Sequence, residues 1–135
     1  MNLDLEQIMI LLQKRYRAFQ EINRLTVELG SVVSRRDEVS ASLLLGMRGD
    51  EIANADSSYR QIWDMSQAGP EAASQIRELM TSDPAAARPS GSFEEQKIYE
   101  IRRKTTALIK EIQEKDRMLN SRVGGDKSYY VKTDR

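Results

Sequence analysis

The stretch SRRDEVSAS, residues 34–42, contains the end of one helical pattern and the start of the next. Arg35 and Arg36 suit a helix C-terminus, where the helix dipole is negative, whereas Asp37 and Glu38 suit an N-terminus, where it is positive. Asp37 can also accept a hydrogen bond as an N-cap residue. We therefore expect a tight reversal over these four residues. Because so short a connection joins neighbours, the two flanking helices should be antiparallel.

Upstream of this reversal, apolar residues recur every three or four positions and predict a helix over residues 3–34. The stripe is broad, which is typical of a helix packed against two neighbours rather than of a two-stranded coiled coil. Arg15 interrupts the stripe, and Gly30 marks a point where the helix could stop or bend, since glycine costs about 1 kcal/mol relative to alanine. The stripe consists of Leu5, Ile8, Leu12, Phe19, Ile22, Thr26, Leu29 and Val33.

Downstream, residues 39–66 keep a helical spacing that is less regular. Gly46 and Gly49 lie inside this pattern, and Arg48 occupies a position on its apolar stripe. Either the glycines allow another helix to approach closely, or the helix is marginal at this point. Trp63 is expected to cover the far end of the core.

A third, shorter helix is predicted over residues 70–81, because Pro70 follows a glycine and proline suits the first position of a helix. Residues 82–91 contain two of the three prolines and should form a linker. Ser92 with Glu95 then forms a capping box at the start of the last helix.

This last helix should run over residues 92–122 and end at Gly124, a residue that readily adopts a left-handed C-cap. No strand pattern competes anywhere, so the sequence predicts an all-α protein, an antiparallel helical hairpin or bundle. The helices should form a single domain over residues 1–123, followed by a flexible tail over residues 124–135.

The composition argues against several classes of function. With 21 basic and 21 acidic side chains the net charge is zero, which disfavours a nucleic-acid or anionic-membrane binder. The chain has no cysteine and no histidine, which removes disulfides, the usual zinc sites and Ser–His triads. The acidic pairs lie at helix starts, where capping explains them. We expect no enzyme, metal or cofactor.

The chain is expected to be cytoplasmic. Its first residues are acidic and then apolar, the reverse of a signal peptide. No apolar run approaches the roughly 20 residues needed to span a bilayer.

The last helix carries an apolar stripe of its own, for which two interpretations stay open. The stripe can complete a bundle with the first two helices, or part of it can remain open as a groove for a partner helix. Met118 and Leu119 are the better candidates for guest contacts, because methionine adapts to varied surfaces.

The tail VGGDKSYYVKTDR, residues 123–135, places Tyr129 and Tyr130 after two glycines. Tyrosine supplies a large contact area at a low entropy cost and is a common anchor in recognition. The tail can either present these tyrosines to a partner or fold back on the bundle.

Two stretches carry a resemblance to a known family: SRRDEVSASLLLGMRGDEI at residues 34–52 and ALIKEIQEKDRMLN at residues 107–120. The first resembles the acidic turn and spaced leucines of the FlgN-type flagellar export chaperones of bacteria, and the second is similar to their final helix. Together with the helix order, the likeness extends over about half of the chain.

The resemblance implies a cytoplasmic chaperone of the flagellar type III export system, without catalysis or a cofactor. Its partners would be the helical C-terminal region of hook–filament junction proteins and a component of the export gate. Tyr129 or Tyr130 would contact that gate. The implied client contacts on the last helix are Ile101, Thr105, Leu108, Ile112, Met118 and Leu119.

Two rival hypotheses remain. In one, the protein is a homodimeric helical adaptor whose last helix pairs with itself, without a secreted client. In the other, the basic run Arg102–Lys104 binds nucleic acid or a membrane surface, which the neutral net charge disfavours.

Overall fold

The computed structural model of the protein describes residues 3–85 and 91–123, and within these ranges it contains helices and no β-strand. The all-α prediction is therefore confirmed. A short 3₁₀ helix joins the second and third α-helices. The elements are α1 (Leu5–Ser34), α2 (Glu38–Asp64), η1 (Met65–Ala68), α3 (Pro70–Thr81) and α4 (Phe93–Val123).

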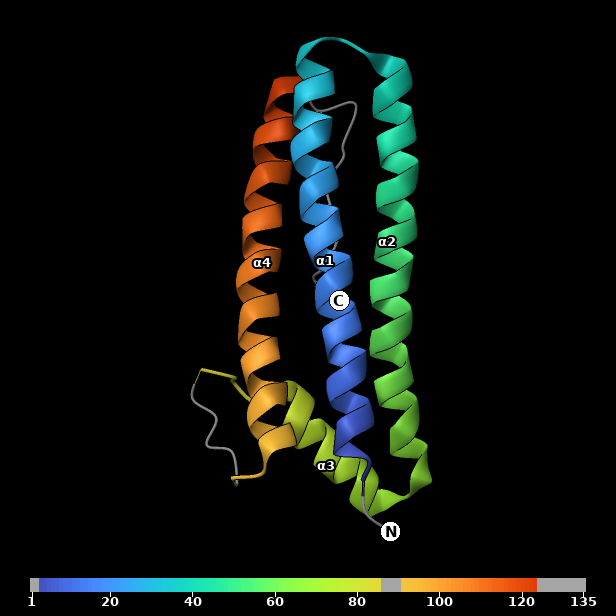
Figure 1. The fold of residues 1–135 in the computed structure, drawn as a ribbon, viewed down its shortest axis with the longest axis vertical. Helices are drawn as coiled ribbons and strands as arrows, with labels where there is room; N and C mark the ends of the chain where they lie inside the picture. Colours follow the sequence, from blue (N-terminus) through green and yellow to red (C-terminus); the bar gives the residue numbers. More distant parts are fainter. Residues whose placement is uncertain (1–2, 86–90, 124–135) are drawn as a thin grey trace.

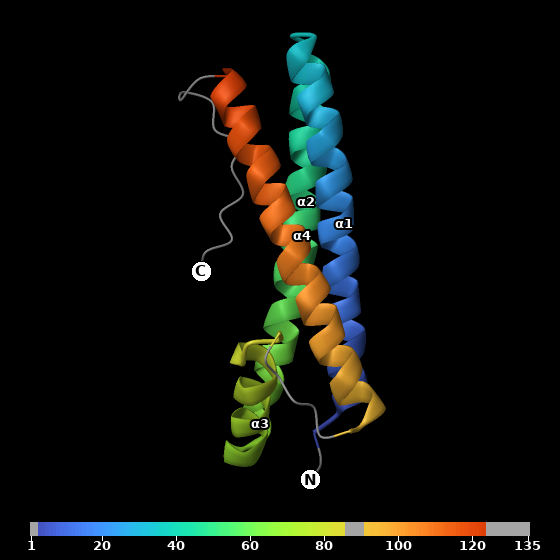
Figure 2. The ribbon, with the colours of Figure 1, turned by 90° about the vertical axis from the view of Figure 1, so that its left-hand side faces the viewer.

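The three long helices are arranged around α1, which lies between α2 and α4 (Figure 1). The largest helix contacts join α1 to α2 and α1 to α4. Helix α3 is packed across one end of the bundle, next to the first residues of α1 and α4 (Figures 1 and 2). Figure 2 also shows that α4 crosses the other two helices at an angle, so that its C-terminal end stands apart from them.

The core is a column of three clusters that follow one another along α1. The cluster beside α3 includes Ile8, Leu12, Ile62 and Ile98, all at most 2% exposed. The middle cluster is built from Ala18, Phe19, Ile22, Ala55 and Ile112. The third cluster, beside the α1–α2 turn, is built from Leu25, Leu29, Val32, Ala41, Leu44 and Leu119. The broad stripe of α1 thus serves two neighbours, as its width predicted.

The turn between α1 and α2 lies where the opposed charge pairs predicted it. Arg36 adopts a left-handed conformation, with φ of 58°. Its N–H donates to the Val33 carbonyl, and the Asp37 N–H donates to the Val32 carbonyl, each at 3.0 Å. This is the Schellman pattern for ending a helix. Asp37 then caps α2, because its Oδ1 accepts from the Ser40 N–H at 3.0 Å.

The glycines that raised doubt in the sequence do not interrupt the helices. Helix α1 continues through Gly30, and α2 continues through Gly46 and Gly49. Helix α4 starts as its capping box predicted, since the Ser92 hydroxyl accepts from the Glu95 N–H at 3.1 Å. The second helix was expected to end at residue 66, whereas α2 ends at Asp64 and is followed by the 3₁₀ turn η1. The predicted C-cap at Gly124 and the tail lie outside the described residues.

The left-handed residue in the first turn gives a test of this description. Arg36 is exposed and carries a Cβ in a conformation that costs an L-residue about 1–2 kcal/mol. We expect Arg36→Gly to raise the free energy of unfolding by about 0.5–1 kcal/mol, after the added entropy of the unfolded chain is subtracted. Thermal unfolding followed by circular dichroism measures the change. Arg36→Ala keeps the Cβ and should show no such gain. Equal effects of the two variants would show that the Cβ at this position is not strained.

Candidate functional site

The six residues implied as client contacts fall into two groups in the structure. Most of them belong to the core: Ile101, Thr105, Ile112 and Leu119 are each at most 5% exposed. Leu108 is partly buried in the middle cluster, and Met118 is 54% exposed. The stripe of α4 therefore completes the bundle along most of its length. While α4 stays on α1, only Met118 and part of Leu108 are accessible to a client.

Met118 lines an open groove between α1 and α4, close to the α1–α2 turn. The groove has a volume of about 270 Å³. Its other exposed large apolar side chain is Val27, which is 56% exposed. We call this surface the α1–α4 groove, and it is formed by Thr26, Val27, Gly30, Ser31 and Ser34 from α1 with Lys115, Met118 and Leu119 from α4. The small side chains on the α1 wall leave its backbone open to close approach.

A polar cluster joins the two walls beside this groove. Lys115 Nζ donates to Asn23 Oδ1 at 2.6 Å and lies 3.0 Å from Glu111 Oε2. Asn23 Nδ2 donates to the same Glu111 oxygen at 3.1 Å. The hydrogen bond and positive charge of Lys115, with the Asn23 hydrogen bond, lower the pKa of Glu111. The groove therefore has one cationic side chain at its rim, held in place by both helices.

A second polar cluster, the buried polar cluster, joins α1, α2 and α4 in the core and consists of Thr26, Arg48 and Asp116. The Arg48 Nη2 atom lies 2.7 Å from both carboxylate oxygens of Asp116, and Arg48 Nε donates to Thr26 Oγ1 at 3.0 Å. The Thr26 hydroxyl donates in turn to the Ile22 carbonyl at 2.7 Å. Arg48 is 4% and Asp116 is 0% exposed. A charge buried this deeply is tolerated only when it is paired and hydrogen-bonded.

The sequence analysis did not predict the buried polar cluster, although part of its signal is visible. Arg48 stands on an apolar stripe, where a charge calls for a partner. Asp116 follows Ile112 by four residues on the stripe of the last helix. Neither position identifies the other, since 67 residues separate them along the chain.

The basic run Arg102–Lys104 is engaged within the protein. Arg102 donates to the carbonyls of Leu79 at 2.8 Å and Ser82 at 2.6 Å, at the C-terminal end of α3. Arg103 donates to the Pro84 carbonyl at 3.1 Å, and Lys104 forms an ion pair with a glutamate one turn earlier in α4. The Arg102 contacts satisfy carbonyls at the end of α3 and attach α3 to α4.

Arg15, which interrupts the stripe of α1, has an aromatic environment. Its guanidinium carbon lies 4.5 Å from the ring centroid of Tyr59 and 5.1 Å from that of Phe19. Burial lowers the pKa of Arg15, and the neighbouring Tyr59 acts in the opposite direction. Cation–π contacts with these two rings therefore allow a charged residue on the apolar stripe of α1.

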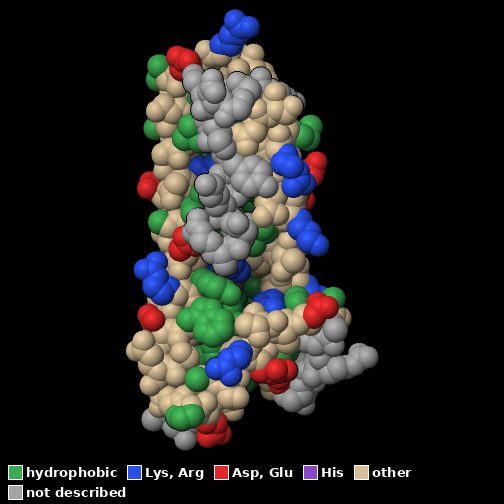
Figure 3. All heavy atoms as spheres, turned by 180° about the vertical axis from the view of Figure 1, so that it is seen from behind, with side chains coloured by type: hydrophobic (Ala, Val, Ile, Leu, Met, Phe, Trp, Pro, Cys, Tyr) green, Lys and Arg blue, Asp and Glu red, His purple; other side chains and the backbone are tan. Residues whose placement is uncertain are grey.

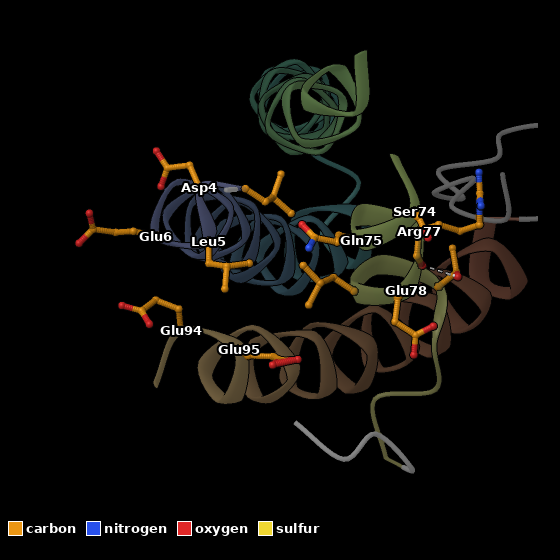
Figure 4. A pocket seen from close by; sticks show the side chains of 12 residues that line it. Asp4, Leu5, Glu6, Ser74, Gln75, Arg77, Glu78, Glu94 and Glu95 are labelled. Carbon is orange, nitrogen blue, oxygen red and sulfur yellow. Dashed lines mark hydrogen bonds between the residues drawn. The ribbon is translucent and has the colours of Figure 1, made fainter. Parts of the chain in front are cut away.

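A wide hollow of about 1000 Å³ lies at the other end of the bundle, between α3 and the starts of α1 and α4 (Figure 4). It is lined by five carboxylates, Asp4, Glu6, Glu78, Glu94 and Glu95, and one arginine, Arg77. The carboxylates point in different directions and do not converge on one centre (Figure 4). Asp4 caps α1 by accepting from the Gln7 N–H at 3.0 Å. Within the described ranges no three acidic side chains are placed to hold a metal ion.

Comparisons with known proteins give no further assignment: no family model, no curated protein and no solved structure matches this chain. Tyr129 and Tyr130, the residues implied to contact an export gate, lie outside the described residues. None of the helices in residues 3–85 and 91–123 is long and apolar enough to cross a membrane.

Removal of one charge tests the buried polar cluster. Asp116→Ala leaves the Arg48 guanidinium in the core without its carboxylate, so we expect the free energy of unfolding to fall by about 3–5 kcal/mol. The double variant Arg48→Met/Asp116→Leu replaces both charges with apolar side chains and should lose much less. Urea unfolding of both variants measures the difference. If the Asp116→Ala protein were as stable as the double variant, Asp116 would not be the partner that neutralises Arg48 in the core.

The polar cluster of Asn23, Glu111 and Lys115 beside the groove predicts that the stability of the protein depends on pH. Because the pKa of Glu111 is lowered in the folded state, its ionised form favours folding above the unfolded pKa, and this contribution is lost as the pH falls through the folded pKa. The protein should therefore be more stable than Glu111→Gln at pH 7, and the difference should shrink below about pH 4.3. Urea midpoints at pH 7 and at pH 3, at low salt, measure it. A difference independent of pH would show that the carboxylate charge is not involved.

Proposed function

We propose that the protein binds the apolar face of a partner helix in the α1–α4 groove. The observation that carries this proposal is that Val27 and Met118, both more than half exposed, line a groove with low walls of small residues. Large apolar side chains at a concave surface are typical of binding sites for other proteins.

The dimensions of the groove suit a short amphipathic segment. On the α1 side it extends from Thr26 to Ser34, which is about 12 Å along a helix axis and a little more than two turns. A partner helix would therefore place two or three apolar anchors there, at three-four spacing.

We further propose that this partner is the helical C-terminal region of a hook–filament junction protein and that the chain is a cytoplasmic export chaperone of the FlgN type. The support is the resemblance of residues 34–52 and 107–120, together with the all-helical bundle and its long last helix. Tyr129 or Tyr130 would contact the export gate. The protein would act by binding alone, without catalysis or a cofactor, and would release its client through competition at the gate.

The two rival hypotheses fit the geometry less well. A homodimer in which the last helix pairs with itself would need the stripe of α4, which is packed against α1. Nucleic-acid or membrane binding through Arg102–Lys104 would compete with the hydrogen bonds that Arg102 and Arg103 already donate to backbone carbonyls. Binding in the α1–α4 groove requires neither the release of α4 from α1 nor the loss of these hydrogen bonds.

Titration calorimetry with the C-terminal helical region of a hook–filament junction protein from the same host tests the proposal. The protein should bind this segment, and Val27→Glu and Met118→Glu should each weaken binding by roughly tenfold or more, as expected for loss of an apolar anchor. Both side chains are exposed, so neither variant should unfold the protein.

Ile10→Glu is the matched control, because Ile10 is a 45% exposed apolar residue of α1 outside the groove. It should bind the client as the unaltered protein does. Absence of binding by the unaltered protein would refute the client assignment. Binding that survives both groove variants would refute the groove.

A further inference from the structure

Helix α3 covers only one end of the side of the bundle on which it lies. Its residues Ile76, Leu79 and Met80 belong to a core cluster that is shared with all three long helices. The middle and third clusters consist of buried residues from α1, α2 and α4 alone. Helix α3 has 12 residues and α4 has 31, so no described helix continues this side of the bundle beyond α3 (Figure 2). Figure 3 shows the molecule from the same side, where hydrophobic side chains gather next to α3.

The helix period identifies the residues that continue this side beyond α3. On α4, Arg102 donates two hydrogen bonds to carbonyls at the end of α3, and Ile109 follows it by seven residues, which is nearly two full turns. On α2, Tyr59 packs against the cluster shared with α3, and Ile52 and Leu45 precede it at the same interval. Ile52, Ile109 and Leu45 pack against the middle or third cluster and remain partly exposed. We call this surface the α2–α4 face, and it is formed by Leu45, Ile52 and Ile109, with Gly49 at its edge.

We propose that residues 124–135 lie in an extended conformation along the α2–α4 face, antiparallel to α4. Helix α4 ends at Val123, at the end of the bundle that lies away from α3 (Figure 2). Gly124 and Gly125 follow, and glycine accepts the left-handed conformations that reverse a chain after a helix. The tail therefore starts beside this face and can run back over it.

The length of the tail matches the α2–α4 face. Ile109 lies about 21 Å from Val123 along α4. An extended chain advances about 3.3 Å per residue, so Tyr129 and Val131 reach about 13 Å and about 20 Å, counted from a reversal at Gly125. Tyr129 then lies on the part of the face nearer the end of α4, and Val131 lies beside Ile109.

The α1–α4 groove also begins at this end of the bundle, but it is too short for the tail. It ends at Lys115, about 12 Å from Val123 along α4. Val131 would lie beyond this end, next to the polar pair of Asn23 and Glu111. The α2–α4 face offers isoleucines at the same distance. Covalent attachment also gives the tail an effective concentration of about 1 mM or more at this face, which a separate partner would have to exceed.

The alternation of residues in the tail predicts which tyrosine faces the bundle. In an extended chain, neighbouring side chains point to opposite sides. Tyr129 shares one side with Val131, whereas Tyr130 shares the other with Ser128 and Lys132. The more apolar side should face the helices, so Tyr129 contacts the α2–α4 face and Tyr130 points away from it.

This inference does not depend on the function proposed above, because the α2–α4 face and the α1–α4 groove have no residue in common. If that function also holds, Tyr130 is the tyrosine that stays available to the export gate. Failure of the gate contact or of client binding would leave the docking of the tail unaffected.

Thermal unfolding of the full chain tests the docked tyrosine. Tyr129→Ala should lower the melting temperature by about 3–6 °C, because it removes a large contact between the tail and the helices. The matched control is Tyr130→Ala, which removes the same side chain at the next residue and should lower it by less than about 1 °C. An unchanged melting temperature in Tyr129→Ala overturns the inference, and so does an equal loss in both variants.

Cysteine pairs locate the tail, because the chain contains no cysteine of its own. Under mild oxidation, Ser128→Cys should form an intramolecular disulfide with Gly49→Cys, at the edge of the α2–α4 face. The reaction should be roughly tenfold faster than with Val27→Cys, in the α1–α4 groove. Val27 is exposed and a Cβ at Gly49 meets no atom within 4 Å, so neither change should disturb the fold. A faster reaction with Val27→Cys would place the tail in the groove, and equal rates would show that it is not docked; either result overturns the inference.

Discussion

The ion pair between Arg48 and Asp116 is the interaction that fixes how the three long helices sit on one another. Apolar stripes attract without direction, and the core clusters alone would tolerate a shift of α4 along α1. The buried pair does not tolerate such a shift, because both carboxylate oxygens lie within hydrogen-bond distance of one guanidinium nitrogen and Thr26 accepts from another. A one-turn slip would leave two charges in the core without each other. We therefore expect the pair to act on register more than on total stability.

The sequence was sufficient for the fold class and for most helix boundaries, because these depend on short-range chemistry. Opposed charges at Arg36 and Asp37, a proline at the start of α3 and the serine cap of α4 each act within one turn of their own position. The buried polar cluster could not be predicted from the sequence, because it depends on long-range contacts. Its two charges come from α2 and α4, and apolar spacing does not reveal which residues meet across a bundle.

The candidate site was harder to predict, since a stripe facing the core and a stripe facing a partner have the same spacing. The apolar residues of α4 matched a client surface in the sequence, yet Ile101, Ile112 and Leu119 are packed on α1. The true outliers are apolar residues outside the main stripes, such as Val27 in α1 and Leu43 in α2. Their positions could have been noted from the helix period, but their exposure depends on where α2 and α4 lie around α1.

The buried polar cluster also bears on the proposed binding of a client. A guest that displaced α4 would gain the apolar surface of α1, but it would first separate Arg48 from Asp116 and expose the core clusters beside them. Breaking a buried pair costs several kcal/mol unless the guest supplies a carboxylate in the same place. A guest in the α1–α4 groove meets Val27 and Met118 on the outside and leaves the pair intact. The cheaper route is the groove, so a chain built around this ion pair should receive its partner on the surface of the bundle and keep α4 in place.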